Sequence, residues 1–232
     1  MKSNFIRGMR NGIPIMLGYF SVSFGFGILA VKMGLSVLQA VGISATNLTS
    51  AGQVAGLSII AAGGSIIEMA LCQFVINLRY ALMGFSLSQH LDNSFTTLHR
   101  IILSFGITDE IFAVAISRSE PISASYMYGL IFTPFIGWTS GTLLGAVAGD
   151  LMPQSVCNAM GLMLYGMFIA IIIPPAKRNF RVLINVIFSA SLSVLFYYVF
   201  PFVSFGFVVI ICAVISSLLC AWLFPIKEEE EK

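Results

Sequence analysis

Long, uncharged apolar segments follow one another along most of this chain. A helix that crosses the hydrocarbon core of a bilayer needs about 20 predominantly apolar residues. Eight segments approach or exceed this length, and the weakest of them, residues 101–117, contains two acidic residues. The others are residues 13–31, 33–67, 69–91, 121–149 and 151–176, and two within 182–226 on either side of Pro201. The pattern predicts an all-α integral membrane protein, a polytopic bundle of seven or eight transmembrane helices.

One segment, residues 33–67, is too long for one simple span and too short for two. Its middle holds small and hydroxyl side chains around a glycine, which favour unwinding of a helix where protein or water surrounds the backbone. We therefore expect a broken helix near residues 50–53 that offers hydroxyls, an amide and free backbone groups to a solute. Close helix packing through small residues is the alternative explanation. The residues concerned are Thr49, Ser50, Ala51, Gly52 and Gln53.

The composition excludes a water-soluble globular protein. Of the 232 residues, 58% are hydrophobic and 9% are charged, whereas a soluble domain has about 25% charged residues. No stretch resembles a separate soluble domain, so we expect a single transmembrane domain over residues 1–232 with the lipid bilayer around it. The sequence has no basic stripe with interleaved aromatic residues, so we expect no nucleic-acid partner.

The sequence patterns of enzymes and metal sites do not occur. The four cysteines lie in apolar segments without the spacing of metal ligands, so we expect no metal and no cofactor. Both histidines, His90 and His99, lie in the polar stretch 88–100. There is no nucleophile elbow and no phosphate-binding glycine loop. We therefore expect that the protein is not an enzyme.

The basic residues are distributed unevenly along the chain. If all eight segments cross, nine lysines and arginines lie on the N-terminal side of the membrane, and only Lys32 and Arg100 lie on the other. Because cytoplasmic loops carry the excess of these residues, both termini are then cytoplasmic. If residues 101–117 do not cross, the bias is nearly as strong but the N-terminus is outside. We favour eight crossings, because the basic flank of the first helix usually dominates orientation.

An alignment of the chain with itself at an offset of 119 residues favours an internal duplication. Several glycines and serines coincide, and Tyr19 aligns with Trp138. The halves would be residues 13–116 and 132–226, with a substrate site at their interface, as in many transporters. They would be parallel with eight crossings and inverted with seven. Chance agreement between two apolar sequences is the alternative.

Four ionisable residues interrupt the apolar segments: Glu68, Arg79, Asp109 and Glu110. A charge at the bilayer centre costs about 2.5–3.5 kcal/mol even on a lenient scale, so such residues often have a function. Adjacent helix positions point about 100° apart, and we expect Asp109 and Glu110 to have different partners. Asp109 is a candidate counter-charge for Arg79 and a site for a proton or an amine. The alternatives are an interfacial Glu68, an Arg79 that reaches the membrane surface, and a surface helix with two hydrated carboxylates.

Four groups of residues occur in a fixed order along the first two thirds of the chain. They are Gly12-Ile13-Pro14 leading to Gly18-Tyr19 and Phe24-Gly25, then Ser50-Ala51-Gly52-Gln53, then Asn77-Leu78-Arg79-Tyr80, and then Thr108-Asp109-Glu110. In this order they resemble the AzlC family of azaleucine-resistance proteins, the large subunit of bacterial branched-chain amino acid exporters. The resemblance covers roughly residues 5–180.

The resemblance implies a multi-pass protein of the bacterial cytoplasmic (inner) membrane. It implies export of leucine, isoleucine and valine, with methionine as a further candidate, by secondary transport driven by the proton gradient or the membrane potential. It also implies a separately encoded partner, a small AzlD-type membrane subunit. Tyr80 stands where many relatives have histidine, which puts a proton role for that position in doubt. Large subunits of the family are often drawn with seven helices.

An amino acid zwitterion needs a cation or a helix N-terminus for its carboxylate, and an anion or carbonyl groups for its ammonium. Arg79 and Asp109 can supply these charges, and the backbone of residues 50–53 can serve either end. The alternatives are a channel or facilitator for another small solute and a non-transporting scaffold subunit. Candidate substrate-binding residues are Tyr19, Thr49, Ser50, Ala51, Gly52, Gln53, Asn77, Arg79, Asp109 and Glu110, and Phe24 and Phe112 are candidates for an apolar pocket.

Overall fold

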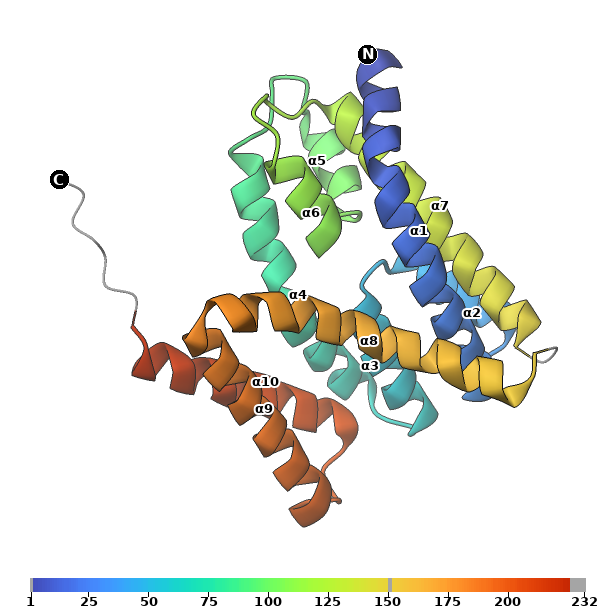
Figure 1. Cartoon of the computed structure of the whole chain (residues 1–232), viewed down its shortest axis with the longest axis vertical. Coiled ribbons are helices and arrows are strands. Elements are labelled where there is room, and N and C mark those ends of the chain that lie inside the picture. Colours follow the sequence, from blue (N-terminus) through green and yellow to red (C-terminus); the bar gives the residue numbers. More distant parts are fainter. Residues whose placement is uncertain (1, 150–151, 226–232) are drawn as a thin grey trace. The chain divides into compact units, whose positions relative to one another are not determined.

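The computed structural model describes residues 2–149 and 152–225, most of which lie in helices (Figure 1). Within this part of the chain the extended pairing is limited to one bridge between Leu91 and Ile122. The predicted all-α class is confirmed. The helices are α1 (Lys2–Lys32), α2 (Val37–Thr46), α3 (Ser50–Ala61), α4 (Ile66–Ser88), α5 (Thr97–Ser104), α6 (Asp109–Ile116), α7 (Ala124–Ala148), α8 (Gln154–Arg178), α9 (Phe180–Val199) and α10 (Phe205–Leu223).

The chain divides into two compact units. The first comprises the described residues of Met1–Leu57 and Asn77–Tyr165, and the second those of Ser58–Ile76 and Gly166–Lys232. Helices α3, α4 and α8 contribute residues to both units. All the candidate substrate-binding residues belong to the first unit.

Five helices in the described part of the chain are long and apolar enough to cross a membrane: α1, α4, α7, α9 and α10. The protein is therefore a multi-pass membrane protein. Five is fewer than the seven or eight expected, and one reason is that two of the expected spans are not continuous. Residues 33–67 contain α2 and α3, and residues 101–117 contain part of α5 and all of α6. A helix of eight to twelve residues is about 12–18 Å long and cannot cross a core of about 30 Å.

Helices α1 and α7 lie side by side and run in the same direction (Figure 1). The glycines of α7 allow the two backbones to approach closely. A Cβ atom on Gly129 would overlap the carbonyl oxygen of Phe5, and one on Gly145 would overlap that of Phe24. Contacts therefore advance together along both helices, which makes the pair parallel. The glycine series of α7 is a packing surface.

Helices α2 and α3 form a hairpin, called hairpin one below. It approaches the α1–α7 pair from the end where both helices stop, which we call the Lys32 end. Ala40 of α2 and Leu57 of α3 lie in one apolar cluster with the last turns of α1 and α7. The chain thus runs inward along α2, turns at residues 47–49 and returns along α3.

The break in residues 33–67 is present, but it lies just before the predicted position. Asn47 ends α2 in an extended conformation, with φ −145° and ψ 108°, and its side-chain oxygen accepts a hydrogen bond from the Thr49 backbone at 3.1 Å. Residues 50–53 are not unwound, because they form the first turn of α3. The physical reason is that the first N–H groups of any helix lack intrahelical partners, so small and hydroxyl residues suit this position.

Helices α5 and α6 form hairpin two, which approaches from the end where α1 and α7 begin, the Arg7 end. The ring of His99 in α5 lies 5.7 Å from the ring of Tyr128, near the start of α7. Thr108, at the turn before α6, instead bonds to Tyr19 in the middle of α1. Helix α6 then returns to the apolar cluster that contains the first turn of α7. The chain therefore turns back at residues 105–108.

The two hairpins enter from opposite ends, and neither crosses the unit. Helix α4 runs toward the Arg7 end, since Arg79 lies beside Asp109 at the middle and Leu87 lies in the cluster with the first turn of α7. The parallel direction of α1 and α7 is the one expected for eight crossings and not for seven. The parallel direction has a different cause from the expected one, because α4 is the spanning helix that lies between α1 and α7 in the sequence.

One residue lies on the opposite side from that expected. Arg100 belongs to α5, which enters from the Arg7 end, so it lies at the same end as Arg7 and Arg118. Among the described residues of the first unit, this leaves Lys32 as the cation at the other end. The correction strengthens the positive-inside bias and favours a cytoplasmic Arg7 end.

In the second unit, Glu68 has a structural role. It lies in the first turn of α4, is 4% exposed and accepts a hydrogen bond from the backbone N–H of Gly206 at 2.8 Å. Ser204 precedes α10 without capping it through its side chain. The Glu68 carboxylate therefore caps α10 from α4, and the positive end of the α10 dipole stabilises its negative charge. A Cβ atom on Gly206 would lie only 2.6 Å from this carboxylate.

Candidate functional site

An ion pair attaches the tip of hairpin two to α4. The Nη1 atom of Arg79 lies 2.8 Å from Oδ2 of Asp109, the first residue of α6. The Nη2 atom of Arg79 donates a hydrogen bond to the Tyr80 hydroxyl at 3.2 Å. The two charged side chains remain 39% and 27% exposed. Asp109 is thus the counter-charge of Arg79, as expected, and the ion pair is partly exposed.

The second acidic residue has another partner, as the angle between adjacent helix positions predicted. The Tyr19 hydroxyl donates a hydrogen bond to Oε2 of Glu110 at 2.5 Å and lies 2.7 Å from the Thr108 hydroxyl. Thr108 also caps α6 by accepting from the backbone N–H of Ile111. Within the described residues, no lysine or arginine forms an ion pair with Glu110.

Hairpin one is held by neutral hydrogen bonds instead. The Oε1 atom of Gln53 accepts from the Trp138 indole N–H at 2.8 Å, and its Nε2 donates to the Ser44 hydroxyl at 2.9 Å. That hydroxyl lies 2.7 Å from the Thr142 hydroxyl. All four side chains are at most 2% exposed. Because every member has a partner, this buried network rigidifies the packing instead of destabilising it.

The rings of Tyr19 and Trp138 link the contacts that hold the two hairpins, which we call their anchors. They meet edge to face with their centroids 5.2 Å apart, a favourable geometry for aromatic pairs. Tyr19 holds hairpin two and Trp138 holds hairpin one. The two residues that align at an offset of 119 thus face each other, whereas the duplication into residues 13–116 and 132–226 stays a prediction.

The tips of both hairpins line a cavity of about 190 Å³. Liquid water occupies about 30 Å³ per molecule, so the cavity has room for a small solute. The Thr49 hydroxyl oxygen is buried, and within the described part of the chain it has no hydrogen-bond partner. Tyr80 connects the cavity to the ion pair, since it accepts from Arg79. The lining residues are Thr46, Asn47, Leu48, Thr49, Tyr80, Ser104, Phe105 and Ile107.

The structure brings together part of the predicted site. Tyr19, Arg79, Asp109 and Glu110 form one group around the tip of hairpin two, and Thr49 lines the cavity. Gln53 holds hairpin one in place through its buried side chain. The remaining candidates are Ser50, Ala51 and Gly52, which form the first turn of α3 with Gln53, and Asn77, which lies two residues before Arg79 in α4.

Several residues of the site were not among the sequence-based candidates. The cavity takes its apolar lining from Leu48, Phe105 and Ile107 and not from Phe24 or Phe112. Phe24 packs its backbone against α7, and Phe112 packs against the apolar cluster of hairpin two. A glycine followed by a threonine cap and two acidic residues at 106–110 is a helix-start signal that marks the second tip.

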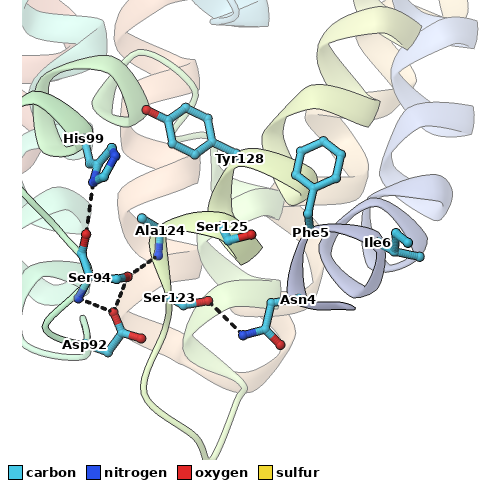
Figure 2. A pocket seen from close by; sticks show the side chains of 10 residues that line it. All are labelled: Asn4, Phe5, Ile6, Asp92, Ser94, His99, Ser123, Ala124, Ser125 and Tyr128. Atoms are coloured by element: carbon cyan, nitrogen blue, oxygen red, sulfur yellow. Dashed lines mark hydrogen bonds between the residues drawn. The ribbon is translucent and has the colours of Figure 1, made fainter. Parts of the chain in front are cut away.

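A larger hollow of about 770 Å³ lies at the Arg7 end, beside the base of hairpin two (Figure 2). Asp92 accepts hydrogen bonds from the backbone and hydroxyl of Ser94, and the Ser94 hydroxyl accepts from the backbone of Ala124. His99 and Tyr128 line its other side. Among the described residues, no group of three or more histidine, cysteine or acidic side chains is placed to hold a metal ion.

The fold is that of a multi-pass α-helical membrane protein, in which two hairpins too short to cross a membrane bring polar residues together at their tips. The chain belongs to the AzlC family, because the family model described as AzlC protein matches residues 14–152, and this membership supports a membrane-transport role. That match contains both hairpins and α4, together with most of α1 and all of α7.

Three relatives support this assignment. The inner membrane protein YgaZ of Escherichia coli is 29% identical over 76% of this chain and 75% of its own length. An uncharacterized membrane protein of Archaeoglobus fulgidus is 27% identical over 94% of both chains. One from Helicobacter pylori is 22% identical over 75% of this chain and 78% of its own. No solved structure matches the chain.

Proposed function

We propose that the protein exports branched-chain amino acids, with methionine as a further candidate, across the cytoplasmic membrane as the large subunit of a two-component exporter. The partner is a small AzlD-type membrane subunit. The observation that carries the proposal is the accessible Arg79–Asp109 ion pair beside a cavity formed by two hairpin tips. YgaZ is named as an inner membrane protein, which supports this location.

A zwitterionic amino acid complements this ion pair. Its carboxylate takes the place of Asp109 at the Arg79 guanidinium, and its ammonium takes the place of Arg79 at the Asp109 carboxylate. Neither protein charge is then left unpaired, which would be costly away from water. The Thr49 hydroxyl, for which the described residues supply no hydrogen-bond partner, can bond to either end of the substrate. An aliphatic side chain fits against the apolar part of the cavity.

Glu110 is the residue that we assign to energy coupling. Its hydrogen-bond partner is the Tyr19 hydroxyl, and no cation among the described residues neutralises it. A carboxylate at membrane depth without a cation can carry a proton between the two sides. Proton coupling therefore runs through Glu110, while Asp109 serves the substrate.

The direct test is amino acid export from loaded cells. Cells are fed dipeptides of leucine, valine or methionine, with and without this chain and a candidate small subunit, and intracellular amino acids are followed. Arg79→Ala and Asp109→Asn should abolish export while the protein still inserts in the membrane. Arg100→Gln, which removes an arginine outside the site, should leave export intact. Wild-type export from both site variants would contradict the proposal.

A channel or facilitator for another small solute is the second candidate. Hairpins that meet inside a membrane unit also suit a pore, since irregular backbone is tolerated where it lines a cavity. Imposing a proton gradient on reconstituted vesicles separates the two functions. An exporter should accelerate when the gradient favours export, whereas a facilitator should ignore it. A scaffold subunit should leave amino acid levels unchanged both alone and with its partner.

A further inference from the structure

The two hairpins belong to two halves of the same pattern, each a hairpin followed by a spanning helix. Residues 36–88 contain α2, α3 and α4, and residues 96–148 contain α5, α6 and α7. Each helix of the second half begins close to sixty residues after its counterpart. The spanning helices run in opposite directions, because α7 is parallel to α1 and α4 is not. The pattern is therefore that of an inverted-topology repeat, a common transporter architecture.

Local details follow the same correspondence. Hydroxyl side chains cap the first helix of each hairpin, Ser36 in one half and Thr96 in the other, each with a complete capping box. Arg79 of α4 and Trp138 of α7 occupy corresponding positions. Each holds the hairpin of the other half, since Arg79 binds Asp109 and Trp138 binds Gln53.

The correspondence fails in the chemistry of the two anchors. Hairpin one is anchored by neutral, fully buried hydrogen bonds. Hairpin two has one buried neutral contact, between the hydroxyls of Tyr19 and Thr108, but it is also anchored by charged groups, two of which are about one third exposed. A substrate or a proton can compete for a charged, accessible contact, but neither has access to the buried network of hairpin one.

From this difference we infer that hairpin two is the moving gate of the cavity and hairpin one is its fixed counterpart. The latch of the gate is the Arg79–Asp109 ion pair. Breaking the latch frees the tip of hairpin two and opens the cavity toward the Arg7 end. Hairpin one keeps the cavity closed toward the Lys32 end in this state.

The base of hairpin two supplies the hinge. Just before α5, the backbone of Asp92 donates to the Ile122 carbonyl, and the backbone of Ile122 donates to the His90 carbonyl, both at 2.9 Å. These bonds tie the chain before α5 to the chain after α6. The hollow of Figure 2 lies beside the base, where α5 contributes His99 to its lining. The tip can therefore move while the base stays attached.

The opening of the gate by substrate rests on the proposed function. A zwitterion that binds Arg79 and Asp109 separates the ion pair and so opens the latch. Opening and substrate binding are then one event, and the ligand must bind the open state more tightly in order to shift the equilibrium. The gate itself does not depend on which ligand opens it.

The test compares two matched buried leucines, one in each hairpin. Leu103 of hairpin two is 4% exposed and Leu57 of hairpin one is 1% exposed. Each is replaced by cysteine in a chain whose own cysteines are changed to alanine. A membrane-impermeant maleimide is added to vesicles from one side or the other. Labelling is measured with the latch intact and with Asp109→Asn.

Breaking the latch should raise the labelling rate of Leu103→Cys from the Arg7 end about fivefold, equivalent to a shift of about 1 kcal/mol. Labelling of Leu57→Cys should change by less than about twofold from either end. Equal increases at both positions, or no increase at Leu103→Cys, would overturn the gate. Arg79→Gln breaks the same latch from the other side and replaces Asp109→Asn if that variant does not fold.

A second set of measurements tests the gate independently of the proposed substrate. Leucine is added to the vesicles with the latch intact. If Asp109→Asn opens hairpin two and leucine does not, the gate stands and the proposed substrate is wrong. If leucine raises the labelling of Leu103→Cys as the substitution does, both are supported.

Discussion

The two hairpins of the first unit have similar lengths and opposite directions, yet they are anchored by different chemistry. Hairpin one is held at Gln53 by neutral bonds to Trp138 and Ser44 in a buried setting. Hairpin two is held at Asp109 by the Arg79 guanidinium and at Glu110 by the Tyr19 hydroxyl, and the ion pair is partly exposed. A buried neutral network stabilises one arrangement. A charged, accessible contact contributes less to stability and can respond to a ligand.

The largest expected effect on stability comes from breaking the anchor of hairpin one. Gln53→Leu removes both side-chain bonds and leaves the Trp138 indole and the Ser44 hydroxyl with fewer partners in a buried place. The stranded Trp138 indole N–H costs about 1–3 kcal/mol, and the Ser44 hydroxyl, which keeps Thr142 as a partner, loses a bond of about 0.5–1.5 kcal/mol. The free energy of unfolding should therefore fall by about 1.5–4.5 kcal/mol. Thermal or chemical unfolding in detergent measures this. A loss no larger than that of Asp109→Asn would contradict the contrast between the hairpins.

A smaller effect is expected from Tyr19→Phe, which keeps the ring contact with Trp138 and removes the hydroxyl. Hydrogen bonds to charged groups contribute about 1.5–3 kcal/mol, and Glu110 loses such a bond. The same unfolding assay should show a loss in this range. Export should also become less dependent on the proton gradient if Glu110 carries the proton. Unchanged coupling in a folded variant would remove that role.

Asp109→Asn should cost less stability than either of these changes. The ion pair is partly exposed, and exposed ion pairs contribute roughly 0–1 kcal/mol. Export, however, should be lost, because the asparagine offers no charge to the substrate ammonium. The exchanged pair Arg79→Asp with Asp109→Arg restores the ion pair but reverses its direction. It should recover stability without export, and recovery of export would show that only the pair itself matters.

The smallest effect is the response to salt. Screening weakens accessible ion pairs and leaves neutral buried bonds unchanged. Raising the ionic strength should therefore lower the stability difference between the wild type and Asp109→Asn by a few tenths of a kcal/mol. The difference between the wild type and Gln53→Leu should stay constant. A common salt dependence would mean that the two anchors are not of different kinds.

Sequence reasoning predicted the membrane class, the pairing of Arg79 with Asp109 and a break in residues 33–67. These features leave local signals, namely long apolar segments, charges within them and a small-residue cluster. The hairpins were not predicted, because the direction in which a short helix returns depends on partners far along the chain. Ser44 and Thr142 pair across the unit, and nothing adjacent to either residue indicates this.

Trp138 is a second residue whose partner the sequence does not indicate. In the sequence it is one aromatic residue among many, aligned with Tyr19 at an offset of 119 residues. In the structure it donates the hydrogen bond that fixes hairpin one. Glu68 and Arg79 show that similar signals can have different meanings. Both are ionisable residues of α4, yet Glu68 caps α10 and Arg79 pairs with Asp109.

The most direct test of the account is a pair of distance measurements between spin labels. One pair joins Ser104, at the tip of hairpin two, to Lys32 on α1, and the other joins Thr46, at the tip of hairpin one, to Arg10. All four side chains are exposed and accept a label. With Asp109→Asn, the Ser104–Lys32 distance distribution should shift to longer values while the Thr46–Arg10 distribution stays unchanged. A shift of the Thr46–Arg10 distribution alone, or equal shifts of both, would contradict the assignment of hairpin two as the moving element.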